Sequence, residues 1–392
     1  MAVSATVAVA GAGLAGLSAA WELSRAGATA VVLDAGRRPG GVVVTERPGA
    51  PGAPGAKEGF VIEGGPDGFL AAEPDIQELA REAGIGGRLV DQLTSGSSLW
   101  TGRGMEPLAE GQAAALLGIQ IPSDVGAQHA APLQCGFRSF ATGMADLVEA
   151  LVARVGPAIR PAQGVTGLAP ATRGWRLSLT GGSTLEAEAV ILALPAWIAA
   201  RLVTAAGVPA ARRLDEVIYY PTTTVSLAYR EDQLATTLAG TGFVSAAELA
   251  EGAAVVRACS YSWLKYPGRA PSGHALLRAF VGPVDGDPAV AAHAELAPIL
   301  GISGGPLWSR AFTWLRGLPR YRSGHAGHVA AVRERLARLP PLAIAGAGFD
   351  GAGVSACVKS GREAARLVLD RLGVNPGPSA RGQPRGDLGG LG

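Results

Sequence analysis

Three glycines near the start of the chain have the spacing of a phosphate-binding turn. Gly11, Gly13 and Gly16 form G-x-G-x-x-G between an apolar run at residues 6–10 and a stretch of helical character at 17–26. The first glycine makes the tight turn, the second lets backbone N–H groups approach a pyrophosphate, and the third permits close helix–strand packing. A second apolar run, 30–33, ends at Asp34, whose carboxylate suits ribose hydroxyls. The pattern predicts dinucleotide binding; the alternative is a glycine-rich crossover with an empty turn.

The composition indicates a folded protein with a large interior. The chain has 392 residues, of which 48% are hydrophobic and 17% charged, so we expect two domains and no wholesale disorder. A net charge of +2 is too small to indicate a nucleic acid as partner. Cys135, Cys259 and Cys357 lie far apart and form no C-x-x-C pair, which favours a reducing cytoplasm over a disulfide framework or a zinc site.

The ends of the chain and its apolar runs indicate no targeting segment. The first residues lack a basic region and lead directly into the glycine turn, so we expect a buried strand there and not a signal peptide. No apolar run reaches the ~18 residues that a membrane span requires. Residues 375–392 have no apolar periodicity, and we expect a disordered tail.

Further glycine-rich segments follow the first motif. Gly40 and Gly41 come shortly after Asp34, and GFVIEGGPDGFL occupies residues 59–70. Near the end, LAIAGAGFDGAGVSACVKSG (342–361) predicts a strand at 342–345, a glycine-rich loop and a helix from about Ser355, which suits the N-cap. This last segment could bind the same ligand, or it could simply be the final βα unit of the fold.

These segments resemble the superfamily of flavin monoamine oxidases, phytoene desaturases and protoporphyrinogen oxidases. In that superfamily a second Gly-Gly turn covers the FAD pyrophosphate, and a C-terminal segment returns to the flavin ring. Four stretches are similar to protoporphyrinogen and coproporphyrinogen oxidases in particular: EGGPDGF (63–69), FRSFATGMADLVEALVARVG (137–156), KYPGRAPSGHALLRAFVG (265–282) and WLRGLPRYRSGH (314–325).

The resemblance implies an FAD cofactor and assigns residues to it. These are Gly11, Gly13, Leu14, Ala15, Gly16, Asp34, Ala35, Arg38, Gly40, Gly41, Gly64, Gly65, Pro66, Asp67, Val165, Gly346, Gly353 and Val354. The helix after the last glycine loop would direct its positive end at the pyrimidine edge of the flavin.

The resemblance also implies an α/β (α+β) two-domain flavoprotein. A Rossmann-like FAD-binding domain would be assembled from residues 1–95, 136–195 and 335–374, and a substrate domain with a mainly antiparallel sheet from 96–135 and 196–334. Local patterns agree, because residues 178–193 have the pattern of two strands around Thr180–Ser183, and 222–229 and 275–281 alternate like half-buried strands.

The activity implied by the resemblance is the dehydrogenation of a porphyrinogen, with hydride transfer to the flavin and reoxidation by molecular oxygen. The partners would be a small-molecule substrate and O2. The cofactor carries this chemistry, so no catalytic side-chain set is required. Arg103, Trp263 and Arg316 are the substrate-side candidates.

Three departures from the family pattern leave the substrate open. The segment between Phe69 and Gly143 is too short for the helical lobe that carries membrane contacts and much of the porphyrin cavity. Ser97 or Ser98 aligns where some relatives place a propionate-binding arginine; Arg103 could replace it or be solvated. Val42 stands where the superfamily has Arg or Lys, which should weaken FAD binding. The alternatives are an amine or metabolite oxidase of a specialised pathway, and a non-catalytic flavin-binding partner protein.

Two further groups of side chains could bind a ligand or could have a structural role only. Arg310, Arg316, Arg320 and Arg322 alternate with Trp308, Trp314 and Tyr321. Such a set could grip carboxylates and stack on a flat ring, or it could be a solvated rim with core aromatics. His325 and His328 form H-x-x-H without further ligands nearby, so we expect no metal.

Overall fold

A five-stranded parallel sheet contains the first apolar run of the chain. The computed structural model describes residues 6–47, 59–108, 112–113, 136–235, 238–246 and 254–374. The strand order is β10-β2-β1-β14-β20, and neighbouring strands are parallel. The strands are β1 (Thr6–Ala10), β2 (Thr29–Leu33), β10 (Ile159–Arg160), β14 (Ala189–Leu192) and β20 (Leu342–Ile344). The apolar sequences of β1, β14 and β20 are explained by burial on both faces.

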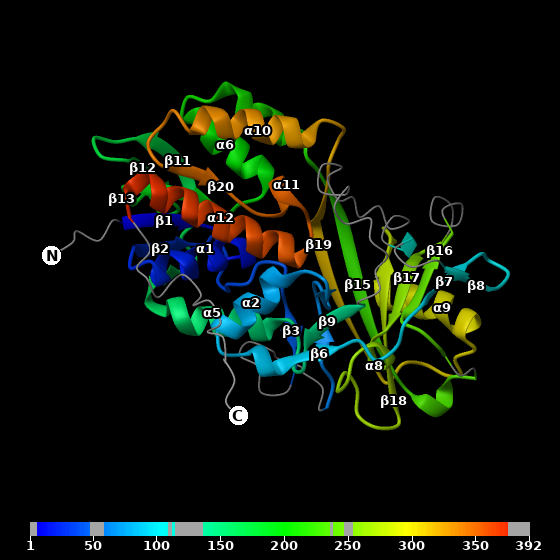
Figure 1. Cartoon of the computed structure of the whole chain (residues 1–392). Coiled ribbons are helices and arrows are strands. Elements are labelled where there is room, and N and C mark those ends of the chain that lie inside the picture. Colours follow the sequence, from blue (N-terminus) through cyan, green and yellow to red (C-terminus); the bar gives the residue numbers. More distant parts are fainter. Residues whose placement is uncertain are drawn as a thin grey trace, which may run out of the picture.

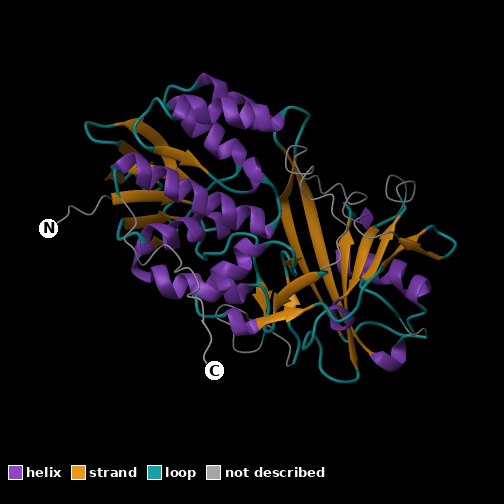
Figure 2. Ribbon diagram, in the orientation of Figure 1, coloured by secondary structure: helices purple, strands orange, loops and turns teal. Residues whose placement is uncertain are grey.

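Helices cover both faces of this sheet (Figures 1 and 2). On one face pack α1 (Leu14–Arg25), α2 (Pro74–Glu82), α5 (Ala145–Val155) and α12 (Val354–Leu372). On the other pack α6 (Ala196–Ala205), α10 (His325–Leu336) and the antiparallel sheet of β11 (Val165–Pro170), β12 (Trp175–Leu179) and β13 (Thr184–Ala187). Val7 and Val9 point to the first core and Ala8 and Ala10 to the second, as strand geometry requires.

A second, seven-stranded sheet lies beside the first (Figure 1). Its order is β19-β15-β18-β17-β16-β7-β8, antiparallel except for the pair β16–β7. The strands are β7 (Ser97–Trp100), β8 (Met105–Leu108), β15 (Ile218–Arg230), β16 (Gly242–Ser245), β17 (Val256–Tyr261), β18 (His274–Val281) and β19 (Trp308–Arg320). Helix α9 (Pro288–Leu300) packs on one face of this sheet.

Short elements complete the described structure. They are β3 (Thr45–Glu46), β4 (Ile62–Glu63), β5 (Phe69–Leu70), β6 (Leu89–Asp91), β9 (Phe137–Phe140), α8 (Ser262–Lys265), α11 (Ala347–Asp350) and the 3-10 helices at Gly86–Arg88, Gly156–Ala158, Pro209–Glu216 and Glu231–Gln233. The predicted fold class is confirmed: a Rossmann-like parallel sheet built from separated segments stands beside a mainly antiparallel sheet.

Two segments that the sequence analysis assigned to the substrate domain pack elsewhere. Leu202 and Leu214 share a buried cluster with Leu192 and Ile344 of the parallel sheet, and so do Val329 and Val332 of α10. We therefore propose that residues 196–217 and 321–334 belong with the nucleotide-binding domain. The predicted tail, 375–392, and part of the shortened region, 109–111 and 114–135, lie outside the described residues.

Candidate cofactor and substrate site

The three glycines of the first motif have different steric environments. Gly11 has φ +101°, and a Cβ on it would lie 2.2 Å from the Ala193 carbonyl oxygen. A Cβ on Gly16 would lie 1.8 Å from the carbonyl oxygen of Gly11, so only glycine allows α1 to start this close to β1. A Cβ on Gly13 would meet no described atom within 4 Å. Two of the glycines are thus required by packing, whereas Gly13 adjoins open space above the N-terminus of α1.

The Gly-Gly turn packs directly on this motif. Gly40 donates its N–H to the Ala12 carbonyl at 2.7 Å, and a Cβ on Gly41 would lie 3.3 Å from the Gly13 Cα. Arg38, predicted to bind the cofactor, braces the turn by donating to the Val43 and Gly41 carbonyls at 2.9 and 2.7 Å. The turn therefore borders the open space at Gly13.

Asp34 lies at the end of β2, next to the glycine motif. One carboxylate oxygen accepts the Ala12 N–H at 2.6 Å and the other accepts the Gly36 N–H at 2.7 Å. Each oxygen keeps lone-pair capacity for a ribose hydroxyl. Ala35 packs under Gly164, and the adjacent Val165 is half-buried in β11, so these two predicted residues can offer backbone or apolar contacts only.

The segment Glu63–Asp67 is held by side chains of the seven-stranded sheet. Trp314 of β19 donates its indole N–H to the Gly64 carbonyl at 2.8 Å, and Thr224 of β15 donates its hydroxyl to the same oxygen at 3.3 Å. Arg278 of β18 donates to the Gly65 carbonyl. Lys265 Nζ donates to Asp67 Oδ2 at 2.9 Å. We call Glu63–Asp67, with Pro66 among its residues, the clamped loop.

Charges under the clamped loop are buried and mutually compensated. Burial alone would raise the pKa of Asp67, but the Lys265 ammonium and the Arg278 guanidinium outweigh it and lower that pKa to about 2. Burial raises the pKa of Glu63, opposed by the Arg269 guanidinium and by hydrogen bonds. Glu63 accepts the Met144 N–H at 2.8 Å and the Thr45 hydroxyl at 2.7 Å, which ties the loop to the start of α5.

The C-terminal glycine loop lies against the first motif. Helices α1 and α12 run side by side (Figure 1), and a Cβ on Gly361 would lie only 2.0 Å from the Ala15 carbonyl oxygen. Gly346 has φ +111° and lies next to Ala15, since a Cβ on it would approach the Ala15 Cβ to 3.5 Å. The predicted site residues at both ends of the chain therefore meet at one edge of the parallel sheet.

The prediction of Ser355 as the N-cap of α12 is wrong. Gly353 occupies the N-cap, Val354 is the first helical residue, and the buried Ser355 hydroxyl has no hydrogen-bond partner among the described residues. Helix α1 likewise begins at Leu14, inside the motif and earlier than predicted, with the uncapped Gly13 before it. Neither helix has a side-chain cap, so the N–H groups of both first turns are available to an acceptor.

These features fit a phosphate-bridged dinucleotide. The open space at Gly13, the uncapped starts of α1 and α12 and the orphaned Ser355 hydroxyl all lie among the predicted cofactor residues. A pyrophosphate would accept N–H donors from α1, and the positive end of α12 would stabilise negative charge on the flavin.

The substrate-side candidates do not gather at one place. Arg103 is exposed in the turn between β7 and β8, at the far edge of the sheet from the clamped loop. Trp263 is half-buried and packs against Tyr261, with ring centroids 6.0 Å apart. Arg316 follows Trp314 by two residues and stacks on Trp197, its guanidinium 4.3 Å from the ring centroid. Arg316 and Trp263 are each two residues from a side chain that holds the clamped loop, Trp314 and Lys265 respectively.

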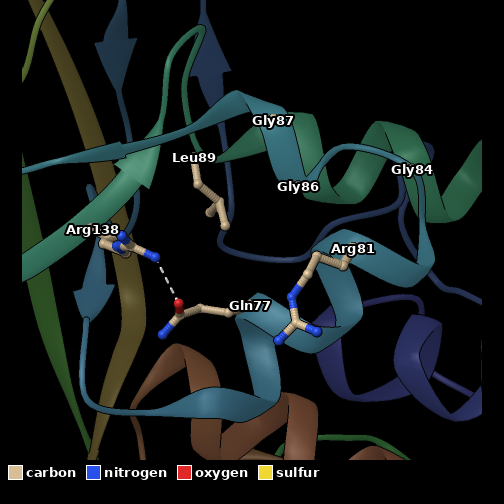
Figure 3. A pocket seen from close by; sticks show the side chains of 7 residues that line it. All are labelled: Gln77, Arg81, Gly84, Gly86, Gly87, Leu89 and Arg138. Atoms are coloured by element: carbon tan, nitrogen blue, oxygen red, sulfur yellow. Dashed lines mark hydrogen bonds between the residues drawn. The ribbon is translucent and has the colours of Figure 1, made fainter. Parts of the chain in front are cut away.

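Two cavities of the described structure lie apart from these residues. The first, about 510 Å³, is lined by Gln77, Arg81, Gly84, Gly86, Gly87, Leu89 and Arg138 (Figure 3). Arg138 donates to the Gln77 side-chain oxygen across it at 2.7 Å and also pairs with Asp91 at 2.6 Å. The second, about 390 Å³, lies between α10, β20 and α12. Neither cavity includes a predicted cofactor residue.

The two histidines of the H-x-x-H pair are engaged in other contacts. His325 stacks on Tyr321, with ring centroids 4.6 Å apart, and His328 lies 3.0 Å from an Arg213 nitrogen. The described residues contain no group of three metal-ligating side chains. Among the described helices, none combines the length and apolar character of a bilayer-spanning segment.

The fold and the site together define a dinucleotide-binding flavoprotein of the Rossmann type. A family model described as flavin-containing amine oxidoreductase matches residues 87–369, and an NAD(P)-binding Rossmann-like domain matches residues 9–83. The chain belongs to the flavin-containing amine oxidoreductases. FAD is the cofactor that this family assignment indicates.

Curated proteins similar to this chain include coproporphyrinogen III oxidases and protoporphyrinogen oxidases. Coproporphyrinogen III oxidase of Bacillus subtilis is 29% identical over 64% of this chain and 55% of its own length. Bovine protoporphyrinogen oxidase is 29% identical over 58% of this chain and 50% of its own. The chain thus aligns with about half the length of these curated relatives.

Solved structures share the whole fold. A protein from Exiguobacterium sp., provisionally described as a protoporphyrinogen oxidase, superposes with TM-score 0.76 at 24% identity, covering 95% of this chain and 99% of its own. Cyclohexylamine oxidase from Brevibacterium oxydans superposes with TM-score 0.71 at 14% identity, covering 95% and 100%.

The sequence analysis missed the residues that hold the clamped loop. Lys265, Arg278 and Trp314 lie in two of the four stretches that carry the resemblance. Trp314 was weighed as a ring-stacking or core aromatic, and no role was assigned to Lys265 or Arg278. The available signal was chemical: the stretch 265–282 contains Lys265 and Arg278 but no acid, so these cations require a partner from elsewhere in the chain if they are buried. That partner, Asp67, lies 198 residues from Lys265.

Proposed function

We propose that this protein dehydrogenates a porphyrinogen, either coproporphyrinogen or protoporphyrinogen, with O2 as the final electron acceptor. The observation that carries the proposal is that Lys265 and Trp314, from two of the four stretches that resemble these oxidases, hold the clamped loop beside the glycine motif. Curated relatives aligned over about half their length are coproporphyrinogen III oxidases and protoporphyrinogen oxidases, which supports the substrate class.

The chain's own residues bind and position FAD and the substrate. FAD, when bound, accepts a hydride and passes the electrons to O2. We propose that Gly11–Gly16 and the Gly40-Gly41 turn hold the pyrophosphate, Asp34 holds a ribose, and the clamped loop and the start of α12 border the flavin. Each turnover removes two electrons and two protons from the substrate, and three turnovers give the aromatic macrocycle and three molecules of hydrogen peroxide. The positive end of α12 would stabilise the negative charge that the flavin gains on reduction.

The cysteines support a cytoplasmic location within this proposal. Cys259 is buried and Cys357 is half-buried, and both are free thiols. Burial raises the pKa of Cys357 to about 12, so its thiol stays protonated and unreactive at neutral pH.

Anaerobic mixing of the purified holoprotein with each porphyrinogen tests the proposal. We expect coproporphyrinogen or protoporphyrinogen to bleach the visible flavin absorption, and readmitted O2 to restore it with release of peroxide. The matching porphyrins, already oxidised, are the control and should leave the flavin unchanged. Bleaching by an amine, and by neither porphyrinogen, would replace this proposal with the metabolite-oxidase alternative.

A further inference from the structure

One serine hydroxyl bonds to both ends of α11, the short helix in the C-terminal glycine loop. The N–H of Gly346, the N-cap of α11, donates to Ser360 Oγ at 2.8 Å, and this hydroxyl donates to Asp350 Oδ2 at 2.5 Å. Ser360 is 3% exposed and lies on α12, seven residues after its N-cap Gly353. The loop that precedes α12 is therefore bonded to the body of the same helix.

The backbone at Gly346 needs this hydrogen bond. Gly346 has φ +111° and ψ −173°, a backbone conformation that is essentially restricted to glycine. The residue is buried, and a buried N–H without an acceptor costs about as much free energy as a lost hydrogen bond. The Ser360 hydroxyl satisfies this N–H and donates its own hydrogen to a carboxylate, so the two bonds strengthen each other. Loss of the hydroxyl would release both ends of α11.

Two tyrosine hydroxyls also contact α11. A Cβ on Gly348 would lie 2.7 Å from Tyr219 Oη, on β15. The hydroxyl of Tyr321, the residue after β19, donates to the Ala347 carbonyl. Together with Ser360 on α12, these contacts fix the position of α11 by side chains from three separate segments of the chain.

Arg333 of α10 adds an exposed cation to these contacts. Its guanidinium donates to the same Asp350 Oδ2 at 2.7 Å. The Arg333 side chain is 41% exposed and that of Asp350 is 22% exposed, and both Arg333 and Ser360 line the second cavity. The hydrogen bonds thus run from a solvent-accessible cation to a buried backbone N–H. We call Arg333, Asp350, Ser360 and the Gly346 N–H the α11 network.

The α11 network holds the chain on both sides of the uncapped start of α12. Asp350 lies three residues before the N-cap Gly353, and Ser360 lies about 10 Å beyond it at 1.5 Å per residue. A helix start held at both points keeps its free N–H groups in one direction. Those groups favour negative charge in front of them, which the flavin gains on reduction.

We propose that Ser360 and Asp350, oriented by Arg333, are positioning residues that hold the start of α12 toward the flavin and thereby raise its reduction potential. The inference rests on the flavin placement in the proposed function and not on the identity of the substrate. The three residues act through the backbone of α11 and the first turn of α12. A purely structural role would instead change the stability of the protein and leave the potential unaltered.

Ser360→Ala tests the inference, with Ser360→Thr as the rescue variant and Ser18→Ala as the matched control. Threonine keeps the hydroxyl, and the cavity beside Ser360 offers space for its methyl group. Ser18 is also buried, on α1, but its hydroxyl has no hydrogen-bond partner among the described residues.

The measured quantity is the midpoint potential of the bound flavin, from anaerobic titration of the holoprotein against a reference dye. We expect Ser360→Ala to weaken the preference for reduced over oxidised flavin about tenfold, which lowers the potential of a two-electron couple by about 30 mV. Ser360→Thr and Ser18→Ala should keep the wild-type potential.

Arg333→Met removes the outermost member of the network without changing a buried residue. It leaves the Asp350 carboxylate without this cation, so the potential should fall by a smaller amount, corresponding to about a threefold change in the same preference. Arg335→Met, at an exposed position of the same helix, is the control and should leave the potential unchanged.

Hydrogen exchange of the apoproteins reports the position of the loop without the cofactor. Amides at 346–356 should exchange faster in Ser360→Ala and Arg333→Met than in the wild type, whereas those at 6–16 should not change. If Ser360→Ala does not fold, Arg333→Met decides by itself.

The failure of this inference is distinguishable from the failure of the proposed function. A wild-type potential in both variants would overturn the inference, whatever their stability and even if the protein oxidises a porphyrinogen. A lowered potential in a protein that oxidises neither porphyrinogen would end the porphyrinogen proposal and support the role of the α11 network.

Discussion

At the scale of single residues, the clamped loop depends on one long-range ion pair. Lys265 and Asp67 are mostly buried, with 12% and 21% of their side chains exposed. Replacing Lys265 by Met leaves Asp67 buried with Arg278 4.0 Å away as its remaining close cation. We expect the free energy of unfolding to fall by about 1–3 kcal/mol and bound FAD to be lost more readily.

Denaturant unfolding and the flavin-to-protein absorbance ratio measure the two effects of Lys265→Met. Lys359→Met is the control, since Lys359 is exposed on α12. Equal flavin retention in both variants would show that the clamped loop does not support the cofactor.

The depressed pKa of Asp67 predicts a specific acid dependence. Its pKa is about 2 in the folded protein against an ordinary value of 3.8. A carboxyl whose folded pKa is lowered stabilises the protein above its unfolded pKa, and this stabilisation is lost as pH falls through the folded pKa. Asp67→Asn should therefore be less stable than the wild type by about 2 kcal/mol at neutral pH. The gap should close between about pH 4 and pH 2, as measured by urea unfolding of both proteins at each pH; a gap that stays constant over this window would contradict the assignment.

At the scale of elements, two glycines of the turn between β1 and α1 have different roles. Gly16 is required for folding, and Gly13 leaves space for the cofactor. Gly13 has φ −71°, a conformation open to any residue, and open space beside it. Gly13→Ala should therefore fold with nearly unchanged stability but bind FAD weakly, because the methyl group occupies the space proposed for the pyrophosphate. Gly16→Ala should destabilise the protein itself, since its Cβ would lie 1.8 Å from a carbonyl oxygen.

Thermal unfolding of the apoproteins and FAD titration distinguish these two variants. The expected pattern is a normal melting temperature with lost affinity for Gly13→Ala, and a lowered melting temperature for Gly16→Ala. Tight FAD binding by a folded Gly13→Ala protein would contradict the proposal that the pyrophosphate lies at this turn.

At the scale of the whole molecule, the cofactor site joins distant parts of the chain. Four segments converge at one edge of the parallel sheet: residues 11–16, 40–41, 63–67 and 346–354. The seven-stranded sheet holds residues 63–67, the clamped loop. FAD should therefore stabilise both sheets together. At a free concentration of 100 times its Kd, the added stability is about 2.7 kcal/mol.

Calorimetry of apoprotein with added FAD measures this effect. A single transition should move up by several degrees, because a kilocalorie shifts the melting temperature of a large domain by roughly 2–4 °C. Riboflavin, which lacks the pyrophosphate, should shift it much less. Two transitions, of which only one responds to FAD, would show that the sheets unfold independently.

Local patterns were sufficient to predict much of this architecture. The glycine motif, the hairpin turn at Thr180–Ser183 and the strands at 222–229 and 275–281 follow from backbone and burial rules that act over a few residues. The single strand predicted after that turn is two strands, β13 and β14, in different sheets. The N-cap of α12 was mispredicted because the prediction used only such local rules. Serine is intrinsically a good cap, but here Gly353 takes that position and Ser355 enters the helix.

By itself, the sequence determined the fold class, the dinucleotide turn and the family, because these depend on short motifs and on the alternation of apolar residues. Only the tertiary structure decided which cations are paired. Lys265 and Arg310 find acids 198 and 264 residues away, whereas Arg316 and Arg320 find aromatic rings and no described acid. Charge pairing depends on distance in space, and the chain brings such partners together only when its two sheets pack.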